Sequence, residues 1–256
     1  MRSVEDVRRR WLDLALKMLT RPGMWTNHAP AFDVMARGLL EDLCFLDERE
    51  MDLEAVHAVL HGYGKLGVAG PFLALFGAHN CVAEVASVFA EQFHRLGYLR
   101  VDHLVDHRWL SDSRTLHDRF DGQDVRRSEV VAECGAPSLI IDGRVLCYAP
   151  ADGSGWVFVD CFAQHAQEYV PGTGSYEARL DDDPLVRTVR RPADDFESGL
   201  ILTLYGNVLR WGPGWWIDHP AHLSQEQQAI AAQLRAIRSA DPSQALDPRG
   251  GRKAPL

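Results

Sequence analysis

The stretch Ser138-Leu-Ile-Ile-Asp-Gly-Arg-Val-Leu-Cys-Tyr148 decides the fold class, because it carries the strongest hairpin pattern in the chain. An Asp-Gly pair between two runs rich in strand-forming residues predicts a tight turn that joins antiparallel strands. We therefore expect strands over residues 138–141 and 144–148, with the turn at Asp142 and Gly143. A third strand is predicted over residues 156–162, after a second turn at 151–155, so this region is expected to form an antiparallel meander.

Upstream of the meander, apolar residues recur at helical spacing. Residues 4–19 show this clearly, since an apolar side chain returns every three or four positions, and Ser3 is placed to cap the helix. Further helices are predicted over residues 30–47, from Asp52 to Gly62 or Gly64, and over 70–96. The last of these is apolar on more than one side, which is typical of the central helix of a bundle.

Downstream of residue 98 the pattern changes. Residues 99–124 are dense in polar side chains and are left without an assignment, whereas 128–132 are expected to form a short helix. Residues 171–195 are rich in Gly, Pro and Asp and predict a long surface loop. Residues 196–209 predict a helix that Asp194 or Asp195 would cap, with a strand as the alternative. Ser224 and Gln227 predict a capping box for a last helix that reaches Ile237.

The predicted fold class is therefore α+β: a helical N-terminal half packed with a small antiparallel β-meander and two C-terminal helices. The chain has 256 residues. We expect one globular domain over residues 1–239, with a helical part at 1–97 and a sheet-containing part at 125–239. Residues 240–256 are rich in Pro, Gly and Arg and predict a disordered basic tail.

The composition of the chain favours some classes of binding partner and disfavours others. The formal net charge is -9, which disfavours nucleic acid and favours a basic protein. The N-terminus lacks a secretory signal, and the most apolar stretch, residues 66–78, is too short to span a bilayer. The scattered cysteines predict reduced thiols and hence a cytoplasmic location. They are Cys44, Cys81, Cys134, Cys147 and Cys161.

Metal chemistry has one candidate segment. His103 and His107 are four residues apart, each beside a carboxylate (Asp102 and Asp106), and His117 follows. Nitrogen and oxygen ligands of this kind suit zinc, iron or manganese. A second histidine pair, His57 and His61, lacks the glutamate of a zinc-protease motif and is interpreted as structural or exposed. We expect a solvated polar segment at 102–118, with a metal site as the alternative.

Nucleophilic catalysis is a weaker alternative. Cys161 has Asp160 beside it and His165 four residues later, but neighbouring residues of a strand point to opposite faces. We therefore expect Cys147 and Cys161 to be core residues of adjacent strands. Neither a nucleophile elbow, nor a P-loop, nor a dinucleotide-binding glycine motif occurs in the chain.

Two groups of side chains are candidates for partner binding. The acids are Asp181, Asp182, Asp183, Asp194, Asp195 and Glu197, and the tryptophans Trp211, Trp215 and Trp216 flank a Gly-Pro-Gly turn. Residues 128–162, a short helix followed by a meander, resemble units used by small binding and inhibitor modules. The hypothesis is a non-enzymatic intracellular protein-binding module without a cofactor, in one version an immunity or antitoxin-like protein that neutralises a basic partner. The alternative is a metal-dependent enzyme that uses residues 102–118.

Overall fold

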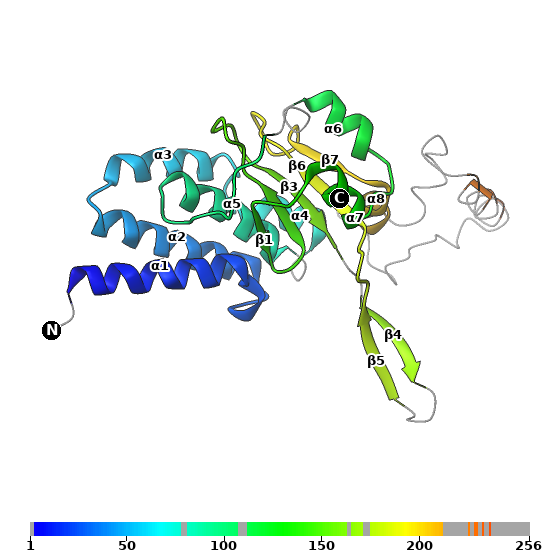
Figure 1. The fold of residues 1–256 in the computed structure, drawn as a ribbon, viewed down its shortest axis with the longest axis horizontal. Coiled ribbons are helices and arrows are strands. Elements are labelled where there is room, and N and C mark those ends of the chain that lie inside the picture. Colours follow the sequence, from blue (N-terminus) through cyan, green and yellow to red (C-terminus); the bar gives the residue numbers. More distant parts are fainter. Residues whose placement is uncertain are drawn as a thin grey trace. The chain divides into compact units, whose positions relative to one another are not determined.

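The computed structural model describes residues 3–77, 81–106, 112–162, 165–170 and 175–211, together with Gln225, Gln228, Ala229, Ala232 and Ala236. These residues confirm the α+β class, with helices in the first half and a five-stranded antiparallel sheet downstream (Figure 1). The contacts group the chain into two compact units. Unit 1 comprises Met1–Arg108, Ala136–Val159 and Arg190–Leu200, and unit 2 comprises Trp109–Gly135, Asp160–Val189 and Ile201–Leu256.

Unit 1 begins with the predicted helices. They are α1 (Val4–Thr20), the short 3-10 helix η1 (Pro22–Met24), α2 (Ala29–Leu46) and α3 (Glu50–His61). Ser3 caps α1 as expected, because its hydroxyl accepts a hydrogen bond from the backbone N–H of Asp6 and the Asp6 carboxylate accepts the N–H of Ser3. In Figure 1, α1 and α2 run side by side, in agreement with their many contacts.

The prediction of one helix over residues 70–96 is wrong. Two helices occupy this region, α4 (Ala69–Phe76) and α5 (Val82–Arg95). Gly77 ends α4 with a φ of 78°, a left-handed conformation that glycine adopts at little steric cost. Its N–H bonds to the carbonyl of Leu73, 2.9 Å away, which closes the last turn.

Helix α5 is the central helix of unit 1. Every residue from Val82 to Phe93 is buried, as the apolar pattern on several sides predicts. The helix packs against α1, α2 and α4. Four of its buried side chains are polar, namely Glu84, Ser87, Glu91 and Gln92. Buried polar groups require hydrogen-bond partners, so these four residues mark where unit 1 departs from a plain apolar core.

The predicted meander is confirmed. Strands β1 (Leu139–Ile141) and β2 (Val145–Tyr148) pair in antiparallel register, with Ile141 opposite Val145. Asp142 and Gly143 both have positive φ, 54° and 69°, as a two-residue hairpin turn requires. Strand β3 (Val157–Cys161) follows β2 in the sheet, and the full order is β1-β2-β3-β6-β7. Within unit 1, α5 contacts β1 and β2.

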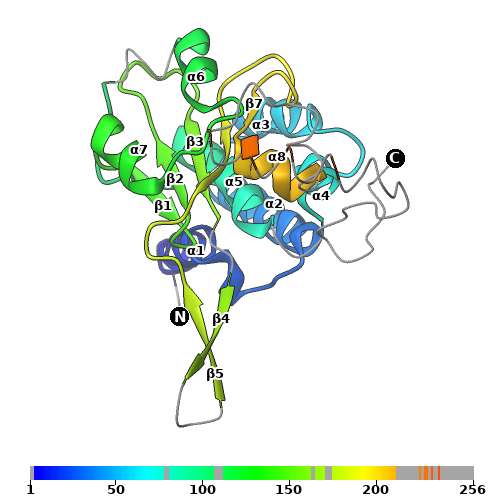
Figure 2. The same cartoon turned by 90° about the vertical axis from the view of Figure 1, so that its right-hand side faces the viewer.

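The prediction of a loop over residues 171–195 is wrong, because strands form there. Strand β5 (Ser175–Leu180) pairs with β4 (His165–Val170) along its whole length, from His165↔Leu180 to Val170↔Ser175. The two make a separate two-stranded ribbon in both views (Figures 1 and 2). Strand β6 (Val186–Arg190) joins the large sheet, where its first four residues are buried. Pairing with neighbouring strands supplies the order that the Gly- and Asp-rich composition does not suggest.

Unit 2 contains three short helices, α6 (Ser113–Phe120), α7 (Arg127–Cys134) and α8 (Leu204–Trp211). The helix predicted from residue 196 begins only at Leu204, because β7 (Leu200–Leu202) precedes α8. Tyr205 and Val208, whose residue types leave a strand possible, lie in the helix. Thr203, and not Asp194 or Asp195, starts α8, since its hydroxyl accepts the N–H of Gly206 at 3.0 Å.

The C-terminal region is described only at single residues. Gln225, Gln228, Ala229, Ala232 and Ala236 are helical, inside the predicted last helix. The predicted cap at Ser224 and Gln227 and the predicted tail over 240–256 lie outside the described residues. In the part of the chain that is described, no helix is both long and apolar enough to cross a membrane.

Candidate functional site

Unit 1 contains a cavity of about 360 Å³. Its walls come from the end of α3, from the last two turns of α5, from the residues just before β3 and from residues 190–196. A cavity of this size lies within the range of small-molecule sites. The polar side chains that line it are Tyr63, Glu91, Gln92, Arg95, Arg190 and Arg191, with Asp194 and Asp195.

Arg190, the last residue of β6, lies against uncharged groups. Its Nη1 donates to the hydroxyl of Tyr63 at 3.3 Å, and its Nη2 donates to the hydroxyl of Ser87 at 2.9 Å. The guanidinium carbon is 3.8 Å from the ring centroid of Phe158, a cation–π distance. No carboxylate of the described residues forms an ion pair with Arg190. The cavity is thus lined by a cation without an acidic partner.

Helix α5 contributes a carboxylate and an amide to the same cavity. The Oε1 atom of Glu91 accepts from Arg95 at 2.7 Å and from the backbone N–H of Trp156 at 3.2 Å, so this acid is neutralised within the chain. Gln92 is 3% exposed, and its side-chain amide makes no hydrogen bond to the described residues. The amide atoms are not among the fully buried atoms that lack a partner, so they reach the cavity and can bond to whatever fills it.

An acidic turn, residues 194–197, borders the cavity. Asp194, Asp195 and Glu197 are exposed. The turn is fixed, because the Asp195 carboxylate accepts the N–H of Ser198 at 2.8 Å. This hydrogen bond holds the pKa of Asp195 below its usual value. The ring of Phe196, in the same turn, packs edge-on against the ring of Phe72, with 4.9 Å between the two centroids.

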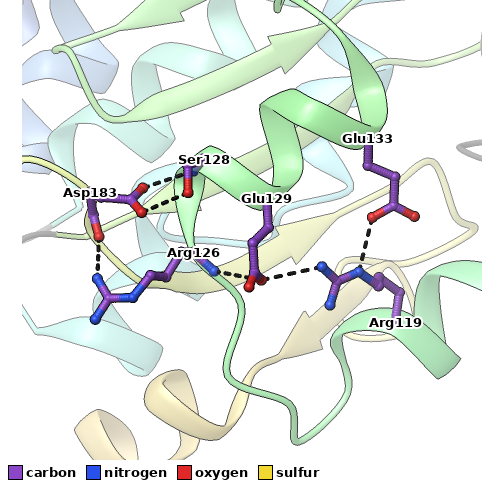
Figure 3. Close-up of polar contacts among 6 residues, drawn as sticks. All are labelled: Arg119, Arg126, Ser128, Glu129, Glu133 and Asp183. Atoms are coloured by element: carbon purple, nitrogen blue, oxygen red, sulfur yellow. Dashed lines mark hydrogen bonds and ion pairs between the residues drawn. The ribbon is translucent and has the colours of Figure 1, made fainter.

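The other predicted acidic segment, residues 181–183, contributes to the architecture of unit 2 through Asp181 and Asp183, and Figure 3 shows the contacts of Asp183. The Asp183 carboxylate accepts the N–H of Ser128 at 2.8 Å and its hydroxyl at 2.7 Å, which caps the start of α7. These bonds lower the pKa of Asp183. Arg126 donates to the Asp183 carbonyl at 2.6 Å and to the Asp181 carboxylate at 3.5 Å. Asp182 is exposed.

A second part of this network joins α6 to α7. Arg119 donates to Glu133 at 3.0 Å and to Glu129 at 3.3 Å, and Glu129 in turn accepts the N–H of Arg126 (Figure 3). The charged side chains of this surface therefore satisfy one another, and they join α6, which lies in the segment left without an assignment, to α7.

The candidate metal ligands do not form a cluster in the described structure. Asp102, His103 and Asp106 lie in an extended segment of unit 1, where Nε2 of His103 is 2.8 Å from the carbonyl oxygen of Ala136. His117 is exposed on α6 of unit 2, and His107 lies outside the described residues. Across the part of the chain that the structure covers, no three His, Cys, Asp or Glu side chains are grouped to hold a metal ion.

The remaining histidine and cysteine candidates have structural surroundings. His57 contacts Glu41, with 3.0 Å between the ring Nε2 and the carboxylate. Cys147 and Cys161 are fully buried, which confirms the prediction that they belong to the core of adjacent strands. Burial raises the pKa of the Cys147 thiol, so it is held in its unreactive form. Asp160 pairs with Arg187 at 2.6 Å in the interior of unit 2.

The predicted tryptophan turn is only partly described. Trp211 lies in α8 and not in a turn, while Trp215 and Trp216 lie outside the described residues. Trp156 is 3% exposed and lines the cavity of unit 1. Sequence reasoning missed Arg190 and Gln92. Gln92 could have been recognised in the sequence, because it is a glutamine inside a helix that is apolar on more than one side.

Comparisons with family models, curated proteins and solved structures gave no match to this chain.

Proposed function

We propose that this chain is a non-enzymatic intracellular protein-binding module, of the immunity or antitoxin kind, which binds a basic partner protein through the acidic turn at residues 194–197. Asp194, Asp195 and Glu197 would face the partner. Their negative charge would accelerate association, because opposite charges steer two proteins toward each other before they touch.

The observation that supports this proposal most is the contrast between the two acidic segments. Asp183 is occupied with capping α7, and Asp181 lies beside Arg126. Asp194 and Glu197, in comparison, are exposed and form no ion pair with any residue in the described ranges. A turn that presents acids in a fixed arrangement loses little side-chain freedom when it binds a cation.

Composition supports the same class of partner and compartment. The formal net charge of -9 repels nucleic acid and favours a basic protein. No disulfide joins the five cysteines, and four of them are buried, which fits the reducing conditions of the cytoplasm.

The test uses a triple variant, Asp194→Asn, Asp195→Asn and Glu197→Gln. Asn at 195 keeps an oxygen that can accept the N–H of Ser198, so the turn should keep its shape. The candidate partners are the products of neighbouring genes, beginning with any basic secreted protein. Surface plasmon resonance at several salt concentrations should give a slower association rate for the variant and a weaker dependence of that rate on salt.

A matched control is Asp182→Asn, which removes one exposed acid from unit 2. It should change association less than any single substitution in the turn. Unchanged association of the triple variant with a partner that binds the wild-type chain would contradict the proposal. Elemental analysis adds an independent check, since stoichiometric metal lost on His103→Ala would favour the enzymatic alternative.

A further inference from the structure

We propose that the cavity of unit 1 binds the carboxylate of an amino acid or of a peptide C-terminus, with Arg190 and Gln92 as the residues that hold it. This inference goes beyond the partner-binding proposal and does not depend on it, because Arg190 and Gln92 would hold the carboxylate whether or not the acids of the turn bind a partner protein.

Arg190 lines the cavity and donates its hydrogen bonds to uncharged hydroxyls only. A guanidinium has five N–H donors in a planar fork that matches the two oxygens of a carboxylate. The structure uses Nη1 for Tyr63 and Nη2 for Ser87, both neutral acceptors. In both bonds only the donor is ionised, whereas a carboxylate would add an ionised acceptor and could accept two parallel bonds from the guanidinium. A carboxylate in the cavity would give Arg190 the acidic partner that the described residues do not supply.

Gln92 on α5 lines the same cavity and offers an independent observation. Its side chain is among the most buried polar groups of unit 1, at 3% exposure, and it lines the cavity without a hydrogen bond to any described residue. Its amide atoms are not among the fully buried atoms that lack a partner, so they reach the cavity, where water or a ligand can bond to them. Its NH₂ group can donate to a carboxylate oxygen.

Tyr63 adds a third donor. Its hydroxyl oxygen accepts the hydrogen bond from Arg190, which leaves its own proton to be donated elsewhere. The indole of Trp156 supplies an apolar wall to the same cavity. Donors on one side and an aromatic surface on another are the usual composition of a small-molecule site.

The acids around the cavity indicate which second charged group the ligand carries. Glu91 is neutralised by Arg95 and by the backbone of Trp156, so it does not cancel the charge of Arg190. Asp194 and Asp195 are exposed at the border, where solvent screens them from a partly buried cation. They favour a ligand that carries an ammonium group as well as a carboxylate. A free amino acid and the end of a short peptide share this chemistry.

The experiment is calorimetric titration of the full chain with leucine, phenylalanine and the tripeptide Gly-Gly-Phe, each compared with its C-terminal amide. We expect at least one carboxylate to bind and its amide to bind at least tenfold more weakly. Preference for the free amino acids or for the tripeptide identifies the source of the carboxylate. Absence of binding by all three carboxylates at millimolar concentration would overturn the proposal, as would equal binding of acids and amides.

Three variants locate the site. Arg190→Met should reduce the affinity at least tenfold, and Gln92→Met, which keeps the volume but removes the amide, should reduce it severalfold. Arg21→Gln is the matched control, because it removes an exposed positive charge of unit 1 far from the cavity lining and should leave the affinity unchanged. If Arg190→Met does not fold, Arg190→Lys keeps the charge but loses the planar fork, and it should still weaken binding. Wild-type affinity in a folded Arg190 variant would overturn the proposal.

Discussion

Arg187 and Arg190 are three residues apart on β6, yet they have opposite surroundings. The side chain of Arg187 is 2% exposed and donates from Nε to Asp160 at 2.6 Å, beside the ring of Phe162. Arg190 contacts two hydroxyls and an aromatic ring and lines a cavity. A buried charge that meets its own acid is compensated within the fold, and removing either partner is costly, whereas a charge at a cavity without an acid is available for a ligand.

The largest effect is expected from Arg187→Met. The substitution leaves Asp160 as a buried acid without its cation, which should lower the free energy of unfolding by about 3–5 kcal/mol. Urea unfolding monitored by circular dichroism measures this change. The double variant Arg187→Met with Asp160→Leu should recover part of the loss, because no isolated charge remains. A loss no larger than that of Arg190→Met would contradict the assignment of Arg187 to the core.

A smaller loss is expected from Gly206→Ala on α8. A Cβ atom at this position would overlap the carbonyl oxygen of Arg187, so the backbone must shift. Overpacking of this kind costs about 1–3 kcal/mol. The same unfolding measurement applies, with Gly38→Ala as the control, since a Cβ at Gly38 meets no atom within 4 Å and should be tolerated. Equal stability of the two variants would show that α8 does not approach β6 so closely.

Arg190→Met should cost less than Arg187→Met. It removes two hydrogen bonds to neutral hydroxyls and the cation–π contacts with Phe72 and Phe158, but it leaves no buried acid unpaired. The expected loss is about 1–2 kcal/mol, since methionine still covers the Phe158 ring. Thermal unfolding without ligand measures it. A loss as large as that of Arg187→Met would mean that Arg190 is also a core residue.

The smallest change in stability is expected from Asp183→Ala, which removes the cap of α7 and should cost about 1 kcal/mol at neutral pH. The bonds from Ser128 lower the pKa of Asp183 in the folded state. Its contribution is therefore present above the unfolded value of about 4 and is lost as the pH falls through the lower folded value. The difference in stability between wild type and variant should shrink in acid. A difference that is constant with pH would contradict a cap made by the ionised carboxylate.

Local patterns determined much of the fold in advance. The spacing of apolar residues in α1 and the Asp142-Gly143 turn act within a few residues, so the sequence alone predicts them. Strands β5 and β6 were missed because their order depends on pairing with neighbouring strands. The cap of α7 by Asp183 joins positions 55 residues apart, and the contact of Arg190 with Ser87 joins positions 103 apart. Such contacts leave no local pattern in the sequence.

Nuclear magnetic resonance can test directly whether Arg190 binds a carboxylate in the cavity of unit 1. The indole N–H signal of Trp156 in the wild-type chain, assigned with Trp156→Phe, is followed during titration with the amino acids and the tripeptide. We predict a saturable shift of this signal with a carboxylate and none in Arg190→Met. A wild-type signal that does not move, or one that moves equally in the variant, would contradict the account.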